Sequence, residues 1–305
     1  MWDQKHQLVY CPIYKVASGT WTTNFLRLSD FNSNLPKWQR FSKLHNASES
    51  VSRKLFPPPK GKKKQLEVLS ESTKFLVVRH PFDRIVSAYK GKIANPMAKP
   101  RFYRKLQKEI KSKYSKNEKE IADEVPPSFE EYWRYLIDIT DGLVHPKDWR
   151  NVDCVQAFYS VCIPCDVEYD VIIKLETHAE DTEYLIRKYN LTELSEPFTM
   201  WKHNSKADNQ IGDYEYYIYD DPKLNPAHLN KDPSDVESST EDLVSKMEED
   251  KEKHIDEKEQ YKRSLFSQLS KNQVRQLYTN YEVDFDMFDY SPDDFIAYAK
   301  DSETH

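Results

Sequence analysis

The chain has 305 residues, of which 31% are charged and 38% hydrophobic, with a formal net charge of −6. This length suits one large domain with a substantial core, and the charged content places part of the chain outside that core. No run of about 18 apolar residues occurs, which excludes a membrane-spanning helix from this sequence, and no secretory leader opens it. Basic residues gather in residues 53–119 and acidic ones in residues 232–259, so the net charge excludes no class of partner.

Residues 8–28 predict a strand, a tight loop and a helix. The run from residue 8 to residue 13 is apolar and β-prone, and from Trp21 onward the apolar residues recur at helical spacing. Ser18 and Thr20 are candidate N-cap residues for that helix. The first backbone N–H groups of such a helix have no intrahelical acceptors, so the helix start is suited to binding an anion.

The loop in this stretch carries groups suited to a phosphate. Lys15 places an ammonium group beside the expected helix start, and Gly19 lets the backbone approach a bound anion closely. The stretch is not a Walker loop, since GxxxxGK[ST] is absent and the lysine precedes the glycine. The alternative is an ordinary strand-to-helix turn with a solvated lysine.

A second unit of the same kind follows at residues 75–93. Residues 75–78 form a short apolar strand pattern that ends at Arg79, and the next pair, His-Pro, breaks the strand. Residues 82–93 then have helical spacing. Two strand–loop–helix units, each with a cation at the carboxyl end of its strand, are typical of an α/β sheet that holds a doubly phosphorylated nucleotide.

Four segments of the chain resemble one known family. KVASGTW (15–21) and VVRHPFDRIVSAY (77–89) look like the two nucleotide-binding segments of Golgi carbohydrate sulfotransferases of the chondroitin, dermatan and natural-killer-epitope type. Residues 162–181 and 266–291 resemble the central and C-terminal segments of the same family. The resemblance implies an α/β fold with a P-loop-like parallel sheet flanked by helices. It is specific for the family and uninformative about the acceptor.

The resemblance also implies 3′-phosphoadenosine 5′-phosphosulfate (PAPS) as sulfuryl donor, with no metal. In the family the first segment holds the 5′-phosphosulfate and the second holds the 3′-phosphate. Lys15 is then the catalytic cation at the leaving phosphate, and Arg79 grips the 3′-phosphate with its planar fork. The residues that this assigns to the donor are Lys15, Ser18, Gly19, Thr20, Trp21, Arg79 and Ser87.

The sequence indicates less clearly which residue takes the proton from the acceptor hydroxyl. The family carries a His-Trp pair in the region of residues 141–153, whereas here Asp148 precedes Trp149 and the nearest histidine is His145. His145 is the first candidate because its intrinsic pKa suits proton abstraction near neutrality. Asp148 or Glu176 comes next, and Glu176, at the carboxyl end of an expected strand, is a secondary base or orienting candidate. The alternatives are a loop histidine with no special role and a structural Glu176.

Two basic segments have two interpretations each. Residues 57–64 hold three prolines followed by four lysines, and residues 99–120 predict a basic helix with Phe102, Leu106 and Ile110 on its apolar stripe. Either segment could attract an acidic glycan, or be a solvated surface. The cations expected on the solvated side of the helix are Arg101, Arg104, Lys105, Lys108, Lys111 and Lys113.

Further local patterns predict the remaining elements. Ser128 and Glu131 form a capping box before an aromatic-rich helix. Residues 167–175 include a buried parallel strand, and a second capping box at residues 177–180 opens a helix. Residues 265–281 have helical spacing. The stretch DFDMF, residues 284–288, is expected to pack the end of the chain on the core.

The four cysteines are Cys11, Cys154, Cys162 and Cys165. No second CxxC accompanies the one at residues 162–165, so buried thiols or a structural disulfide are favoured over zinc, with the pairing open.

Two sequons, at Asn46 and Asn190, fit a luminal glycoprotein. Members of the resembled family sit in the Golgi lumen on a type II membrane anchor. The first expected strand begins at Leu8, which leaves no room for that anchor here. We therefore expect a truncated or trimmed luminal domain, with a soluble protein as the alternative.

These observations predict one catalytic domain over residues 1–305, with a flexible acidic insertion at residues 206–260. The predicted activity is PAPS-dependent O-sulfation of a glycan hydroxyl, on a glycosaminoglycan or a glycoprotein sugar. The expected partner is an acidic polysaccharide or a glycoprotein, and not a nucleic acid. The alternatives are a non-catalytic glycan-binding module on a decayed sulfotransferase fold and a sulfotransferase acting on a non-carbohydrate acceptor.

Overall fold

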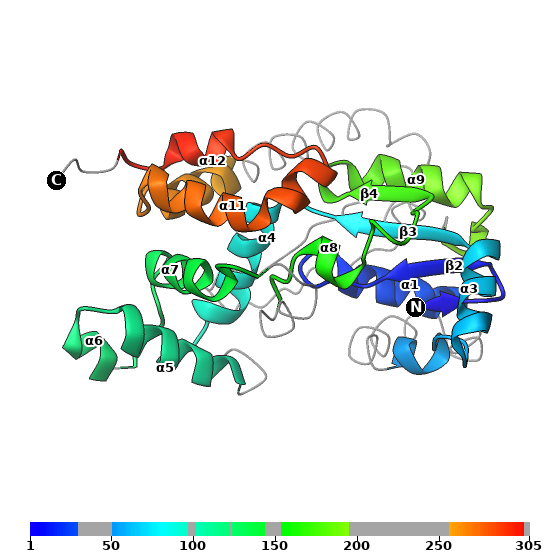
Figure 1. The fold of residues 1–305 in the computed structure, drawn as a ribbon, viewed down its shortest axis with the longest axis horizontal. Coiled ribbons are helices and arrows are strands. Elements are labelled where there is room, and N and C mark those ends of the chain that lie inside the picture. Colours follow the sequence, from blue (N-terminus) through cyan, green and yellow to red (C-terminus); the bar gives the residue numbers. More distant parts are fainter. Residues whose placement is uncertain (30–50, 97–101, 123, 144–153, 195–255, 302–305) are drawn as a thin grey trace, which may run out of the picture.

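The computed structural model describes residues 1–29, 51–96, 102–122, 124–143, 154–194 and 256–301. Figure 1 shows a sheet at one end of the molecule and a group of helices at the other. Most of the predicted acidic insertion lies outside the described residues, and its last five residues, 256–260, belong to a helix that runs to residue 266. Within the described residues, no helix combines the length and the apolar character needed to cross a membrane.

The sheet is mixed and has the strand order β1-β2-β3-β4. Its strands are β1 (Trp2–Asp3), β2 (Leu8–Cys11), β3 (Thr73–Val78) and β4 (Val171–Lys174). β2, β3 and β4 are parallel, as predicted, and β1 adds an antiparallel edge that the sequence analysis missed. Because β2 and β3 are parallel neighbours, the loops that follow them meet at the same edge of the sheet.

Helices surround the sheet and build the other end of the molecule (Figure 1). In chain order they are α1 (Ser18–Leu28), α3 (Lys62–Glu71), α4 (Pro81–Ala88), the π-helix η2 (Tyr89–Ile93), α5 (Phe102–Tyr114), α6 (Glu118–Ala122), α7 (Phe129–Thr140), α8 (Phe158–Val161), the 3₁₀ helix η4 (Leu175–Thr177), α9 (His178–Lys188), the 3₁₀ helix η5 (Thr192–Leu194), α11 (Lys271–Met287) and α12 (Asp293–Tyr298).

Local capping patterns predicted some helix starts and not others. The Ser128–Glu131 capping box is present at α7, and an unpredicted one, Ser270 with Gln273, starts α11. The expected helix over residues 265–281 is therefore displaced toward the C-terminus. The predicted capping box at Thr177 is wrong, because the Thr177 hydroxyl donates to Asp181 and does not cap the helix.

Helix α5 buries Ile110 and packs Leu106 against the core, as predicted, but it differs from the prediction at other positions. Phe102, expected on the apolar stripe, is 50% exposed. The buried positions are Tyr103, Gln107, Ile110, Lys111 and Tyr114. The expectation that Lys111 is solvated is wrong, because its ammonium lies 2.6 Å from Glu120 and 3.1 Å from Glu131. This ion triad joins α5, α6 and α7, which sequence spacing within α5 could not reveal.

Two hydrophobic clusters form the core. Under the sheet, Tyr10 stacks on Phe75 at 4.8 Å between ring centroids, and Trp21 packs on Phe75 at 4.6 Å. Among the helices, Phe82 packs on Trp133 and on Phe285. The expected packing of residues 284–288 on the core is confirmed, since the Asp284, Phe285 and Phe288 side chains are buried. The chain crosses from one cluster to the other where β3 turns into α4.

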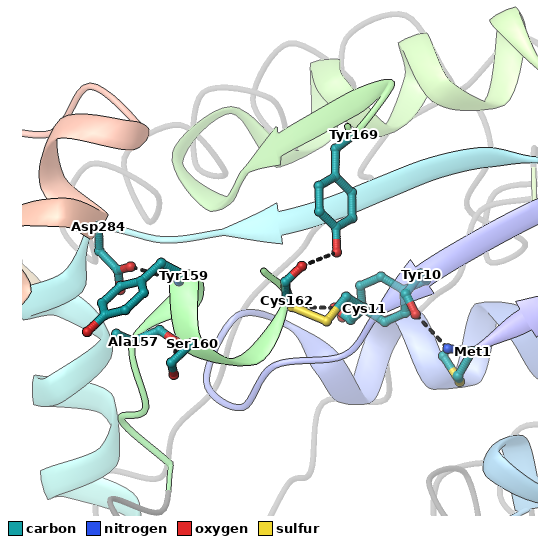
Figure 2. The surroundings of a disulfide bond; sticks show 9 residues. All are labelled: Met1, Tyr10, Cys11, Ala157, Tyr159, Ser160, Cys162, Tyr169 and Asp284. Atoms are coloured by element: carbon teal, nitrogen blue, oxygen red, sulfur yellow. Dashed lines mark hydrogen bonds between the residues drawn. A yellow bond between two sulfur atoms is a disulfide. The ribbon is translucent and has the colours of Figure 1, made fainter. Parts of the chain in front are cut away.

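A disulfide ties the end of β2 to the turn after α8. Cys11 and Cys162 are joined across 151 residues of sequence, and Tyr169 donates a hydrogen bond to the Cys162 carbonyl (Figure 2). Cys154 is a buried free thiol and Cys165 an exposed one. The structure thus decides the pairing that the sequence left open, and it fixes the start of the Lys15 loop.

The disulfide predicts a measurable loss of stability. Because the bond restricts the unfolded chain, Cys11→Ser/Cys162→Ser should unfold with about 2–4 kcal/mol less free energy than the parent under non-reducing conditions. Urea denaturation followed by circular dichroism measures the difference. Cys165→Ser is the matched control and should match the parent. Equal stability of the double variant and the parent would contradict a structural role for the bond.

Candidate functional site

The loops after β2 and β3 meet, as the parallel pairing requires. Lys15 lies in the first loop in a left-handed conformation, with φ of 69°. Arg79 follows β3 directly, and its Nη1 donates a hydrogen bond to the Lys15 carbonyl at 3.3 Å. Both side chains are half-buried. The structure therefore brings the guanidinium of Arg79 to the backbone of Lys15, 64 residues earlier in the chain.

The first turn of α1 lies beside Lys15 and Arg79, and these three parts together are called the cationic corner below. The helix is preceded by Ala17 in a left-handed conformation, with φ of 59°, and no side chain caps it, so the N-cap prediction for Ser18 and Thr20 is wrong. No acidic residue occupies the first turn. A Cβ added at Gly19 would meet nothing within 4 Å, so this part of the helix start faces open space. The helix dipole there favours a bound anion.

Trp21 differs from the other expected donor-binding residues. Its backbone N–H already donates to the Ala17 carbonyl at 3.1 Å. Its side chain is fully buried, and the indole N–H donates to Nε2 of His178 at 3.2 Å. We conclude that Trp21 packs the start of α1 against the start of α9, and that its amide is not directed at a ligand.

The turn from β3 into α4 is held by His80, whose role the sequence analysis missed. Nδ1 of His80 accepts the Phe82 N–H at 3.2 Å, which caps α4, and Nε2 lies 2.9 Å from the Ser291 carbonyl oxygen. Burial lowers the pKa of His80 below its ordinary value. The ring is therefore neutral, with its proton on Nε2 directed at Ser291. A histidine just before a proline at a helix start was the available signal.

The remaining candidates fall into three groups. Ser87 lies on α4, as expected, with its side chain 5% exposed. Glu176 lies in η4 and accepts two hydrogen bonds, from the His80 N–H at 2.9 Å and from the Tyr290 hydroxyl at 2.8 Å. These contacts favour its structural interpretation over a role as base. His145 and Asp148 lie outside the described residues.

The residues around the Lys15 and Arg79 loops limit the kinds of ligand that this site can bind. The lysines of residues 60–64 lie just before and in the first turn of α3, which Figure 1 places at the end of the sheet opposite the Lys15 and Arg79 loops. Among the described residues, no group of three or more His, Cys, Asp and Glu side chains is arranged to hold a metal ion. What the corner offers is an ammonium, a guanidinium and helix-start amides, which together suit phosphate or sulfate groups.

The profile of the sulfotransferase family matches residues 1–223. The chain belongs to the sulfotransferase family. It is 32% identical to carbohydrate sulfotransferase 12 of Xenopus laevis over 212 residues, covering 63% of this chain and 48% of that protein. It is 29% identical to carbohydrate sulfotransferase 11 of Rattus norvegicus over 238 residues (72% and 64%), and 23% identical to carbohydrate sulfotransferase 10 of Xenopus laevis over 301 residues (96% and 68%).

The chain thus spans about half to two-thirds of the length of these sulfotransferase relatives. No solved structure matches it. Family membership agrees with the mixed α/β sheet and with the resemblance found in the two loop segments.

The Trp21–His178 bond predicts how stability depends on pH. Burial lowers the pKa of His178 from 6.5 to about 4, so the unfolded chain binds this proton more readily. The free energy of unfolding should keep its full value above about pH 6.5. It should fall as the pH drops toward 4, by up to about 3 kcal/mol. His178→Gln keeps an acceptor for the indole but cannot titrate, so its urea denaturation midpoints should fall less over this range. An unchanged pH profile in the variant would contradict this account.

Proposed function

We propose that the protein transfers a sulfuryl group from PAPS to a hydroxyl group of a glycan. The observation that carries the proposal is the meeting of the Lys15 and Arg79 loops beside an uncapped helix start at the carboxyl edge of the sheet. Two anion-binding elements at one edge suit a nucleotide with phosphates at both its 3′ and 5′ positions. The curated relatives, named carbohydrate sulfotransferases, support the glycan as acceptor class.

The proposal gives each donor residue a task. PAPS supplies the sulfuryl group when bound. The Lys15 ammonium neutralises the charge that develops on the leaving phosphate, and Ser18, Gly19 and Thr20 present helix-start amides and hydroxyls to the 5′-phosphate. Arg79 holds the 3′-phosphate, with the Ser87 hydroxyl as a second donor. The arrangement needs no metal, because charge compensation comes from side chains and amides.

The acceptor side rests on residues outside those that the structure describes. His145 is the proposed general base and Asp148 the alternative, since both oxygens of Glu176 are engaged. An acidic polysaccharide or a glycoprotein is the proposed acceptor. The exposed cations Arg104 and Lys105 on α5 provide positive surface for it.

We propose that this activity takes place in the Golgi lumen, with the protein held by a type II membrane anchor. The Cys11–Cys162 disulfide supports an oxidising compartment. The sequon at Asn190 follows α9 with its asparagine exposed, which suits a glycoprotein.

Nucleotide binding tests the proposal first. Because a ligand of the folded state raises the melting temperature, 3′-phosphoadenosine 5′-phosphate should stabilise the protein, whereas 5′-AMP and ATP at the same concentration should do so less. Arg79→Ala should weaken the affinity for the bisphosphate, measured by calorimetry, toward that for 5′-AMP. If folded parent protein shows no shift at millimolar bisphosphate, the site is decayed and the glycan-binding module becomes the better hypothesis.

Lys15 tests the chemistry separately from binding. Lys15→Ala removes the charge at the leaving phosphate, so turnover should fall by at least about 100-fold. Transfer of labelled sulfate from PAPS to a panel of glycosaminoglycans and glycoprotein glycans measures it. Lys90→Ala, on η2, is a control of the same residue type and should keep most of the activity. Near-normal turnover of Lys15→Ala would overturn the mechanism.

A further inference from the structure

We propose that Glu176 and Tyr290 are positioning residues that hold the Arg79–His80 turn in its ligand-binding shape. Through these contacts the C-terminal tail, residues 288–301, controls the affinity of the protein for the 3′-phosphate of the nucleotide. The inference rests on the proposed function for its ligand. Its structural basis is a set of contacts from η4, α11 and the tail that converge on one turn.

The turn itself lacks regular secondary structure. Residues 79 and 80 lie between the end of β3 and the start of α4 and belong to neither. The His80 N–H donates to the Glu176 carboxylate at 2.9 Å. A backbone N–H to carboxylate hydrogen bond is stronger than a neutral one, so it restrains the peptide that carries Arg79.

Tyr290 fixes the carboxylate that makes this bond. Its hydroxyl donates to the second oxygen of Glu176 at 2.8 Å. The ammonium of Lys174, at the end of β4, lies 4.7 Å from the Tyr290 ring centroid, and the Tyr290 N–H donates to the Phe285 carbonyl. Tyr290 is thus anchored to the sheet on one side and to α11 on the other, and its hydroxyl restrains the Glu176 carboxylate.

Residues of the same tail also contact the turn at the side chain of His80. Nε2 of His80 donates to the Ser291 carbonyl at 2.9 Å, and its ring stacks on Phe295 at 4.5 Å. Phe285 packs edge-on against the same ring at 5.2 Å. Two neighbouring tail residues, Tyr290 and Ser291, therefore hold the turn through two separate routes.

Arg79 lies within reach of this network. Its positive charge partly opposes the rise in the pKa of Tyr290 that burial and the Glu176 carboxylate cause. Its guanidinium also bonds to the Lys15 carbonyl, so a shift of the turn would move the contact between the two loops. A change in the tail is thereby transmitted to both proposed phosphate-binding residues.

Two substitutions of Glu176 distinguish three possible roles of its side chain, because each role predicts a different change in bisphosphate affinity or turnover. A carboxylate near a bound phosphate repels it, so a purely electrostatic role predicts tighter binding in both Glu176→Ala and Glu176→Gln. A base predicts unchanged affinity with lost turnover in both. A positioning role predicts that Glu176→Ala weakens bisphosphate binding about tenfold, while Glu176→Gln, which keeps an acceptor oxygen, stays within about threefold of the parent.

The experiment combines bisphosphate affinity, by calorimetry, with amide hydrogen exchange of the ligand-free protein. Glu176→Ala and Tyr290→Phe should both weaken binding and speed exchange in the peptide that holds His80. Tyr184→Phe removes an exposed hydroxyl on α9 and is the matched control, expected to change neither. Melting temperatures of all variants identify any general loss of folding.

Two outcomes overturn the proposal. One is exchange at the turn that is the same in all variants, which would show that the contacts do not restrain it. The other is faster exchange with unchanged bisphosphate affinity, which would show that the turn's shape does not matter for the ligand. Failure of the parent to bind bisphosphate would instead refute the proposed function, and the exchange data would still decide whether Glu176 and Tyr290 hold the turn.

Discussion

The neutral ring of His80 is the constraint on which this arrangement depends. The chain must leave β3, expose a cation at the edge of the sheet and start α4 within a few residues. His80 meets this requirement because Nδ1 accepts the Phe82 N–H while Nε2 donates to the Ser291 carbonyl. A protonated ring would lose the first of these bonds. Burial among Phe285, Tyr290 and Phe295 opposes protonation and keeps the ring in the form that the turn needs.

Long-range ties hold the first loop in the same way. The strand pairing of β2 with β3 sets the two loops side by side, the Cys11–Cys162 disulfide fixes the chain just before Lys15, and the Trp21–His178 bond fixes it just after. The left-handed backbone of Lys15 and Ala17 lies between these anchors. Such conformations cost free energy, and they persist where the surrounding structure determines them. The backbone of the loop is therefore shaped by the contacts at its two ends.

Patterns confined to a few residues were predictable from the sequence. The positions of β2, β3 and β4 and the Ser128 capping box depend on residues within one element, so short apolar runs and capping spacing were sufficient to identify them. The pattern also placed Lys15 and Arg79 after two expected strands, and parallel pairing of those strands brings the two loops to one edge of the sheet. The burial of Lys111 on α5 was mispredicted, since it depends on two carboxylates from other helices.

The sequence by itself determined the α/β class, the order of the two cationic loops and, through them, the family. Only the tertiary structure decided which cysteine pairs with Cys11, that the Trp21 amide is used within its own helix, and that Glu176 is held by Tyr290. The physical reason is range: hydrophobic periodicity and capping act over a few residues, whereas these contacts join residues far apart in the chain. Their partners are set by how the strands and helices pack, and no local pattern records that packing.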